Sequence, residues 1–245
     1  MFPIRDHNPS QGTPFVTYAL IAANVLVFLL TLPAGADPHA LEALYLSWAL
    51  IPAVSDPVTY VTSQFLHAGL LHLGGNMLFL WIFGDNMEER MGRLPFLAFY
   101  LASGIGAALA QVAADPVSTI PMVGASGAIA GVMGGYLLLF PRARVDVLFV
   151  FLIFFRIFPI PAWLVLGGWF GIQAASSAAA TGAEGGVAYL AHVGGFATGL
   201  ILTLPLWLRL GGPAFWGRTH GHPPHPVASY RLNRSSIPKA GHRRR

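Results

Sequence analysis

Long apolar runs constrain the fold of this chain more than any other feature of its sequence. A helix needs about 20 apolar residues to cross the hydrocarbon core of a bilayer. Five runs of about that length are present, at residues 15 to 32, 61 to 83, 94 to 114, 120 to 140 and 187 to 208. Hydrophobic residues make up 55% of the chain and charged residues only 10%, whereas a soluble domain carries about 25% charged residues. The sequence therefore predicts an integral membrane protein.

The segment from residue 145 to residue 178 is apolar almost throughout, yet it is too short for two crossings and a turn, which would need more than about 40 residues. Its Pro159-Ile160-Pro161 sequence favours a break, because proline removes a backbone donor and disfavours helix in the residue before it. We predict one span at about residues 160 to 178, preceded by a short interfacial or re-entrant piece. The expected fold class is an all-α membrane bundle of six transmembrane helices.

The distribution of basic residues tests this topology. All 14 Lys and Arg residues fall in segments that six spans place on the side of the termini. The three opposite loops, residues 33 to 60, 115 to 119 and 179 to 186, contain none. Because cytoplasmic loops of membrane proteins carry an excess of Lys and Arg, both termini are expected in the cytoplasm.

Three segments are expected along the chain: a cytoplasmic N-terminal segment (1–14), a membrane domain (15–208) and a flexible, basic cytoplasmic tail (209–245). The first apolar run lacks a small-residue cleavage site after a short core, so it is expected to remain as a span. The tail is rich in Pro, Gly, His and Arg, a composition typical of chain outside a packed core. We expect neither a cofactor nor a metal: the chain has no Cys and no HExxH motif, and the tail histidines are expected to be solvated, at His220, His222 and His225.

Polar side chains are expensive in hydrocarbon, and this chain keeps several at the outer ends of its spans. His67, His72 and Asn76 open the second span in HAGLLHLGGN, Ser126 lies near the start of the fourth in GASG, and His192 opens the sixth in AHVGG. These three spans all run inward in the predicted topology. Their polar residues are therefore expected in one layer of the outer leaflet.

Small residues give a reason for contact between the fourth and sixth spans. Gly124 and Gly127 flank the serine, and Gly195 and Gly199 repeat a small-xxx-small spacing on the histidine-bearing span, which allows two backbones to approach closely. A histidine within hydrogen-bond reach of Ser126 Oγ could take its proton and make the hydroxyl a nucleophile. Unpaired backbone N–H groups where the helix begins could stabilise an oxyanion.

His72 and Asn76 are four residues apart, hence on one face of the second span, where a donor pair suits an oxyanion hole. His67 lies about 140° away on an ideal helix, so we expect it to cap the site or fix a loop. Gly74 and Gly75 are expected to admit a neighbouring helix. Each residue alone has a structural alternative, since a lone serine in a membrane helix usually packs or bonds to its own backbone.

Taken together, GASG around Ser126, AHVGG around His192 and HxxxxHxxxN in the second span resemble the rhomboid family of intramembrane serine proteases, over residues 15 to 208. The resemblance implies that Ser126 attacks the scissile carbonyl and that His192 is general base and then general acid. It implies an oxyanion held by His72, Asn76 and the Ser126 backbone N–H. The implied substrates are single-span or other membrane proteins in a bacterial inner membrane, surrounded by lipid and with no nucleic-acid partner.

The resemblance further implies that the fifth span, with Trp169 and Phe170, and the loop before the sixth control substrate entry. The motif MEERMG, which contains Glu88 and Arg90, is similar to the family's inner-end motif and is expected to tie spans together. We expect Trp48 to anchor the first external loop in the membrane interface.

One departure from the family pattern concerns the histidine. Ala130 stands where many members have a Tyr stacked on that ring, so another residue must orient His192, and Tyr189 is our candidate. Two other functions stay open from the residues alone. One is a rhomboid-like protein that binds membrane helices without cutting them, and the other is a small transporter that uses the span histidines as a relay.

Overall fold

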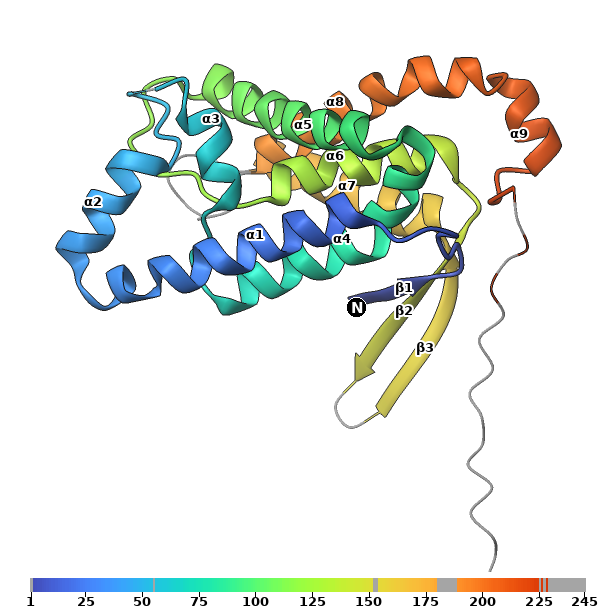
Figure 1. Ribbon diagram of the computed structural model, residues 1–245, viewed down its shortest axis with the longest axis horizontal. Coiled ribbons are helices and arrows are strands. Elements are labelled where there is room, and N and C mark those ends of the chain that lie inside the picture. Colours follow the sequence, from blue (N-terminus) through green and yellow to red (C-terminus); the bar gives the residue numbers. More distant parts are fainter. Residues whose placement is uncertain are drawn as a thin grey trace, which may run out of the picture.

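The computed structural model describes residues 2–54, 56–151, 154–179, 189–224, 226 and 228. Helices dominate it, and the long ones run side by side along the molecule with a small sheet at one end (Figure 1). The helices are α1 (Phe15–Thr31), η1 (Leu32–Ala36), α2 (Pro38–Trp48), α3 (Thr59–Thr62), η2 (Ser63–Phe65), α4 (Leu70–Met91), α5 (Arg93–Ala114), α6 (Ser126–Leu139), α7 (Ala162–Ala179), α8 (Tyr189–Arg209) and α9 (Pro213–Thr219). The strands are β1 (Phe2–Asp6), β2 (Arg144–Phe151) and β3 (Phe154–Pro161).

Several helices have the length and composition of membrane spans. Phe15–Ala36, Arg93–Ala114 and Tyr189–Arg209 qualify singly, and Thr59–Phe65 with Leu70–Met91 qualify as a pair bent by 97°. The predicted second span is therefore not one straight helix: the chain breaks between η2 and α4, where Gly69 has fully extended backbone. A helical membrane bundle is confirmed, while the count of six spans stays a prediction.

Helix α6 forms the centre of the bundle, and every residue from Gly127 to Tyr136 is buried. A side chain at Gly199 of α8 would overlap the Gly131 carbonyl of α6, and one at Gly195 would overlap the Gly127 carbonyl. The predicted close approach of these two spans is thus confirmed. The matching expectation for Gly74 and Gly75 is wrong, because nothing lies within 4 Å of a side chain added at either.

A three-stranded antiparallel sheet of order β1-β2-β3 was not predicted. The expected interfacial or re-entrant piece before α7 is a β-hairpin, made by β2 and β3, and the N-terminal strand adds to it. Asp146 of β2 ties the strands together, because its carboxylate accepts hydrogen bonds from Arg5 Nε at 2.7 Å and His7 Nε2 at 2.8 Å. The expected all-α class therefore needs this small sheet added.

Buried polar contacts hold the end of the bundle where α1 begins and α4 ends. Glu88 of α4 accepts hydrogen bonds from the backbone N–H groups of Val16 and Thr17 at 3.0 and 2.8 Å, and from the Thr17 hydroxyl at 2.9 Å. The carboxylate thus satisfies free N–H groups in the first turn of α1. Arg90 lies over the Phe140 ring, 5.7 Å from its centroid. The MEERMG segment ties helices together, as the resemblance implied.

The segment predicted as a flexible tail begins differently in the structure. After α8 the chain forms α9, whose Phe215 is buried and whose Trp216 Nε1 donates a hydrogen bond to the Leu138 carbonyl at 2.9 Å. Apolar side chains give this short helix a surface to pack with, which the surrounding Pro, Gly and His residues obscured in the sequence. His225 and residues 229–245 lie outside the described residues.

Candidate active site

Ser126 is the first residue of α6, and backbone hydrogen bonds to neighbouring segments hold the loop that precedes it. Gly124 adopts a φ of 126°, in the left-handed region that favours glycine, and its N–H donates to the Ser63 carbonyl at 2.9 Å. Leu50 and Met122 exchange two backbone hydrogen bonds. The serine therefore lies on a rigid helix start, where its own N–H has no acceptor one turn earlier in the helix.

The structure brings Ser126 and His192 together. His192 Nε2 lies 2.9 Å from Ser126 Oγ, within hydrogen-bond distance. The glycine contacts between α6 and α8 explain how a short serine side chain reaches an imidazole on another helix. This contact was predicted from the sequence.

Two residues of α7 hold the His192 ring from its other side. His192 Nδ1 lies 2.7 Å from Gln173 Oε1, and the Trp169 ring lies 5.6 Å from the imidazole, centroid to centroid. An amide oxygen only accepts hydrogen bonds, so the proton of a neutral His192 is on Nδ1 and the free lone pair on Nε2 faces Ser126. Tyr189, our sequence candidate, is not among the residues that hold this ring in the described part of the chain.

Gln173 was missed by the sequence analysis, although a signal was present. It is the only amide or ionisable side chain in the predicted span from residue 160 to residue 178. A polar group at that depth is costly unless it is used. Ala130 is fully buried in α6, and the Trp169 ring of α7 lies beside His192, the ring for which the resemblance left no stacking partner at position 130.

The residues predicted as oxyanion donors lie on α4 beside the serine loop. A side chain added at Gly124 would meet the His72 imidazole at 2.8 Å and Asn76 Nδ2 at 3.6 Å, so this glycine lets the loop lie against both residues. His67 fixes Asn76, because Asn76 Nδ2 donates to His67 Nε2 at 2.9 Å, and its ring packs edge-on against His72 at 5.1 Å. His67 lies before the start of α4 at Leu70, and it holds the Asn76 side chain in place.

One cavity of about 1060 Å³ joins these groups. Ser126, His192, His72 and Asn76 all line it, together with residues of α5 and of the segment between α1 and α3. Its size suits an extended peptide segment rather than a single small ion. The arrangement brings a serine hydroxyl, two imidazoles and a side-chain amide to one cavity.

The gate residues named from the resemblance both lie on α7. Trp169 lines the cavity and contacts His192, while Phe170 stacks on Phe196 of α8 with 4.6 Å between ring centroids. The loop before α8, named with them, lies outside the described residues. Helix α7 therefore closes one side of the cavity and touches the histidine directly.

The fold and this site define a helical integral membrane protein with a Ser-His pair in a cavity between its helices. The model of the Rhomboid domain matches residues 55–209, more than half of the chain. The chain belongs to the rhomboid family.

Named relatives agree with this assignment. The chain is 30% identical to "Rhomboid protein 1, mitochondrial" of Saccharomyces cerevisiae over 76% of its own length and 51% of the relative. It is 36% identical to "Rhomboid protease GluP" of Bacillus subtilis over 52% of its length and 25% of the relative. It is 31% identical to the human "Presenilin-associated rhomboid-like protein, mitochondrial" over 59% of its length and 38% of the relative. The chain thus spans about half or less of these relatives.

Proposed function

We propose that this protein is an intramembrane serine endopeptidase that cleaves other membrane proteins within or beside a transmembrane helix. The observation that carries the proposal is the 2.9 Å approach of His192 Nε2 to Ser126 Oγ at the start of a buried helix. The tautomer set by Gln173 supports it, because the nitrogen that faces the hydroxyl is the one able to accept its proton.

In the first step Ser126 Oγ attacks the scissile carbonyl carbon while His192 Nε2 takes the hydroxyl proton. The carbonyl π pair moves to oxygen and forms an oxyanion. When the tetrahedral intermediate collapses, the C–N bond breaks and His192 gives its proton to the leaving amine. Water then repeats the sequence on the acyl-enzyme and restores the serine.

The oxyanion would be held by His72, Asn76 and the Ser126 backbone N–H. Donors that face a developing negative charge in a site with little water contribute strongly to the rate. Their common place along the cavity wall supports the assignment. His67 would serve by fixing the Asn76 amide.

Substrates would be proteins with at least one membrane span, and the protein would lie in a bacterial inner membrane with both termini in the cytoplasm. The one-sided distribution of Lys and Arg supports this orientation. The word protease in the name of the Bacillus subtilis relative supports the activity.

A non-cleaving member of the family is the alternative, since family membership alone is compatible with it. The retained Ser126 and His192 argue against that alternative, because a protein that only binds helices has no need of an aligned pair. A transporter that uses span histidines as a proton relay is less well supported, because His192 bonds to a hydroxyl and an amide rather than to an acid.

The decisive experiment uses the purified protein in detergent and a fluorophosphonate probe that reacts with activated serines. We expect the wild type to be labelled and both Ser126→Ala and His192→Ala to be unlabelled, although each remains folded by circular dichroism. Cleavage of a reporter transmembrane substrate should vanish in the same two variants. His72→Ala or Asn76→Ala should slow cleavage about 10²- to 10³-fold, as for a lost oxyanion donor. Labelling of Ser126→Ala at the wild-type rate would refute the mechanism.

A further inference from the structure

Helix α7 supplies both residues that hold the far side of the His192 ring. Trp169 and Gln173 are four residues apart, hence on one face of α7, and that face meets His192 of α8. The opposite side of α7 is lightly packed, since nothing lies within 4 Å of a side chain added at Gly171, and the flanking Ile172 is 65% exposed. The contacts to the histidine and the Phe170–Phe196 stack both tie α7 to α8 in the described part of the chain.

The bond to Gln173 has a chemical consequence. A neutral imidazole carries its proton on either nitrogen, and only the form with the proton on Nδ1 accepts a proton from Ser126 at Nε2. The acceptor Oε1, 2.7 Å from Nδ1, selects that form and also restrains the ring angle. A carboxylate often takes this place in serine hydrolases, whereas an amide does so here without a charge in the membrane.

We infer that Gln173 is a positioning residue for His192, and that the catalytic pair is aligned only while α7 lies against α8. The inference rests on the proposed protease function. A movement of α7 away from α8 would remove the acceptor at Nδ1 and the Trp169 ring together. Substrate entry past α7 and alignment of the base are then linked by one helix.

The test measures the pH dependence of fluorophosphonate labelling in Gln173 variants. In this reaction the Ser126 Oγ–P bond forms, the P–F bond breaks, fluoride leaves and His192 takes the serine proton. Gln173→Met keeps the side-chain volume but removes the acceptor. We expect it to react about tenfold more slowly at neutral pH, which corresponds to one neutral hydrogen bond.

Gln173→Glu keeps an oxygen at the same place and adds a negative charge that favours the imidazolium. We expect it to recover the rate at high pH and to move the acid limb of the pH–rate profile up by about one pH unit or more. A packing role alone would leave Gln173→Met at the wild-type rate, because that variant keeps the side-chain volume. Ile172→Leu, one residue away on the exposed side, is the matched control and should behave as the wild type.

Wild-type rates in Gln173→Met, or an unmoved acid limb in Gln173→Glu, would overturn the inference while Ser126→Ala still loses labelling. If the wild type itself is not labelled, the proposed function fails instead. The two failures are therefore distinguishable.

The β2-β3 hairpin supports a second, independent inference about lipid contact. It projects sideways from the bundle at the end where the N-terminal strand lies, across the direction of the long helices (Figure 1). Large apolar side chains of the sheet are exposed, at Phe155 (68%), Phe2 (59%), Val150 (46%), Phe158 (45%) and Ile157 (40%).

Neither water nor the hydrocarbon core suits this element. The exposed apolar side chains occur on both faces of the hairpin, since residues 155 and 157 share one face and residue 158 lies on the other. In the described sheet β1 and β3 are the two edges, and open strand edges in hydrocarbon leave backbone groups without partners. The boundary between headgroups and acyl chains suits both features, because it accommodates exposed apolar side chains and offers hydrogen-bond partners to open strand edges.

Continuity and charge identify the occupant of this surface. Helix α7 begins at Ala162, directly after β3, so the hairpin lies at the N-terminal end of a helix of the bundle. Arg144 and Arg156 are exposed on the hairpin, whereas its acidic residue Asp146 is buried and bonded to Arg5. We propose that the hairpin lies in the headgroup region of the cytoplasmic leaflet and binds anionic lipid there.

This placement can be measured because the chain contains no Cys. Phe155→Cys, labelled with an environment-sensitive NBD fluorophore, is reconstituted in vesicles of phosphatidylethanolamine with phosphatidylglycerol. We expect blue-shifted emission that is quenched more by spin labels near the headgroup than by labels deep in the chains. Gln11→Cys, exposed at the same end of the molecule, is the control and should report water. Val150→Cys provides a second labelling position should the first variant misfold.

Three results would overturn the lipid assignment. They are emission at position 155 equal to that at position 11, strongest quenching by the deep label, and a shift seen in native membranes but not in pure lipid vesicles. The last result would indicate a protein partner for the hairpin.

Discussion

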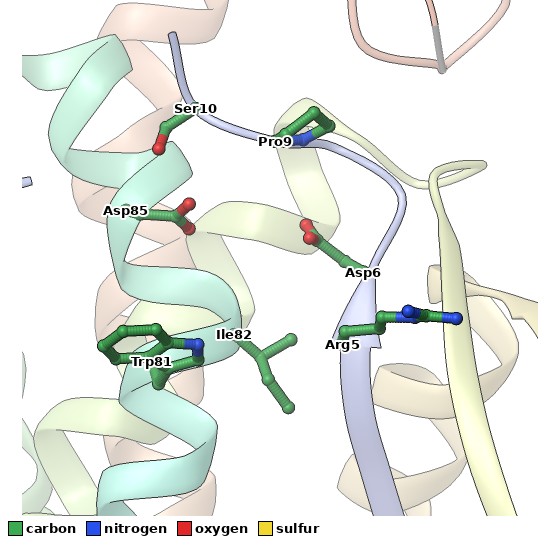
Figure 2. Close-up of a pocket in the computed structure, with 7 residues that line it drawn as sticks. All are labelled: Arg5, Asp6, Pro9, Ser10, Trp81, Ile82 and Asp85. Atoms are coloured by element: carbon green, nitrogen blue, oxygen red, sulfur yellow. The ribbon is translucent and has the colours of Figure 1, made fainter. Parts of the chain in front are cut away.

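Asp6 lets the pH dependence of stability be worked out from the structure. This carboxyl group is buried at the end of β1 and accepts a hydrogen bond from the Tyr136 hydroxyl at 2.7 Å. Figure 2 shows it facing the same small pocket as Asp85. Burial, chiefly, raises the pKa of Asp6 from 3.8 to about 8, and the nearby Asp85 adds to the effect while the Tyr136 bond opposes it.

The direction in which stability changes with pH follows from the linkage between protonation and folding. Below pH 4 Asp6 is protonated in both the folded and the unfolded protein. Between pH 4 and pH 8 Asp6 ionises in the unfolded chain before it ionises in the folded protein. The free energy of unfolding therefore falls as the pH rises, and it has fallen fully once the pH exceeds the pKa of the folded state. Each pH unit of that interval corresponds to about 1.4 kcal/mol, which gives an upper bound of about 6 kcal/mol.

Asp6→Asn removes the charge and keeps an oxygen that can accept the Tyr136 hydroxyl. We expect the variant to match the wild type at pH 4 and to be more stable at pH 8, as measured by thermal unfolding in detergent with tryptophan fluorescence. Asp146→Asn is the control of opposite sign. Burial alone would raise the pKa of Asp146, but the bonds from Arg5 and His7 prevail and lower it, so this variant should lose stability at neutral pH. A pH profile of Asp6→Asn that parallels the wild type would refute the reasoning.

Two further substitutions test the packing of the bundle. Gly199→Ala would drive a methyl group into the Gly131 carbonyl and separate α6 from α8, so we expect at least a tenfold slower reaction with the fluorophosphonate probe, corresponding to about 1.4 kcal/mol. Gly217→Ala, in α9 with nothing within 4 Å, should leave that rate unchanged. Glu88→Gln removes part of the acceptor capacity at the start of α1 and should cost about 1–3 kcal/mol in unfolding free energy. Glu42→Gln, at an exposed position, should unfold at the wild-type temperature, and equal unfolding of both glutamate variants would contradict the assigned role of Glu88.

The sequence predicted the helical membrane bundle because crossing a bilayer needs long apolar runs, and such runs are visible without any knowledge of packing. It also predicted the Ser126–His192 contact. One-sided charge predicted a direction for each span, that direction predicted a common depth for the polar residues, and small residues predicted that two helices touch. Each of these steps depends on local composition or spacing.

The parts that were missed depend on contacts between distant segments. Gln173 is one amide in an apolar helix, and only the rotation of α7 against α8 decides that it faces His192. The hairpin lacks the alternation of apolar and polar residues that marks a half-buried strand, because both its faces are apolar. The strand β1, Phe2–Asp6, has the sequence FPIRD, which lacks the strict alternation of apolar and polar residues that marks a strand.

The pairing of β1 with β2 sets an order of events during biosynthesis. Arg5 and Asp146 are 141 positions apart, so β1 has no partner strand until α1, α4, α5 and α6 have been made. At about 5–20 residues per second, that interval is roughly 7 to 28 s. Helices α1, α4, α5 and α6 can insert during this time, whereas the sheet cannot form. Closure of the sheet therefore follows the synthesis of these four helices, and the N-terminal strand stays unpaired until then.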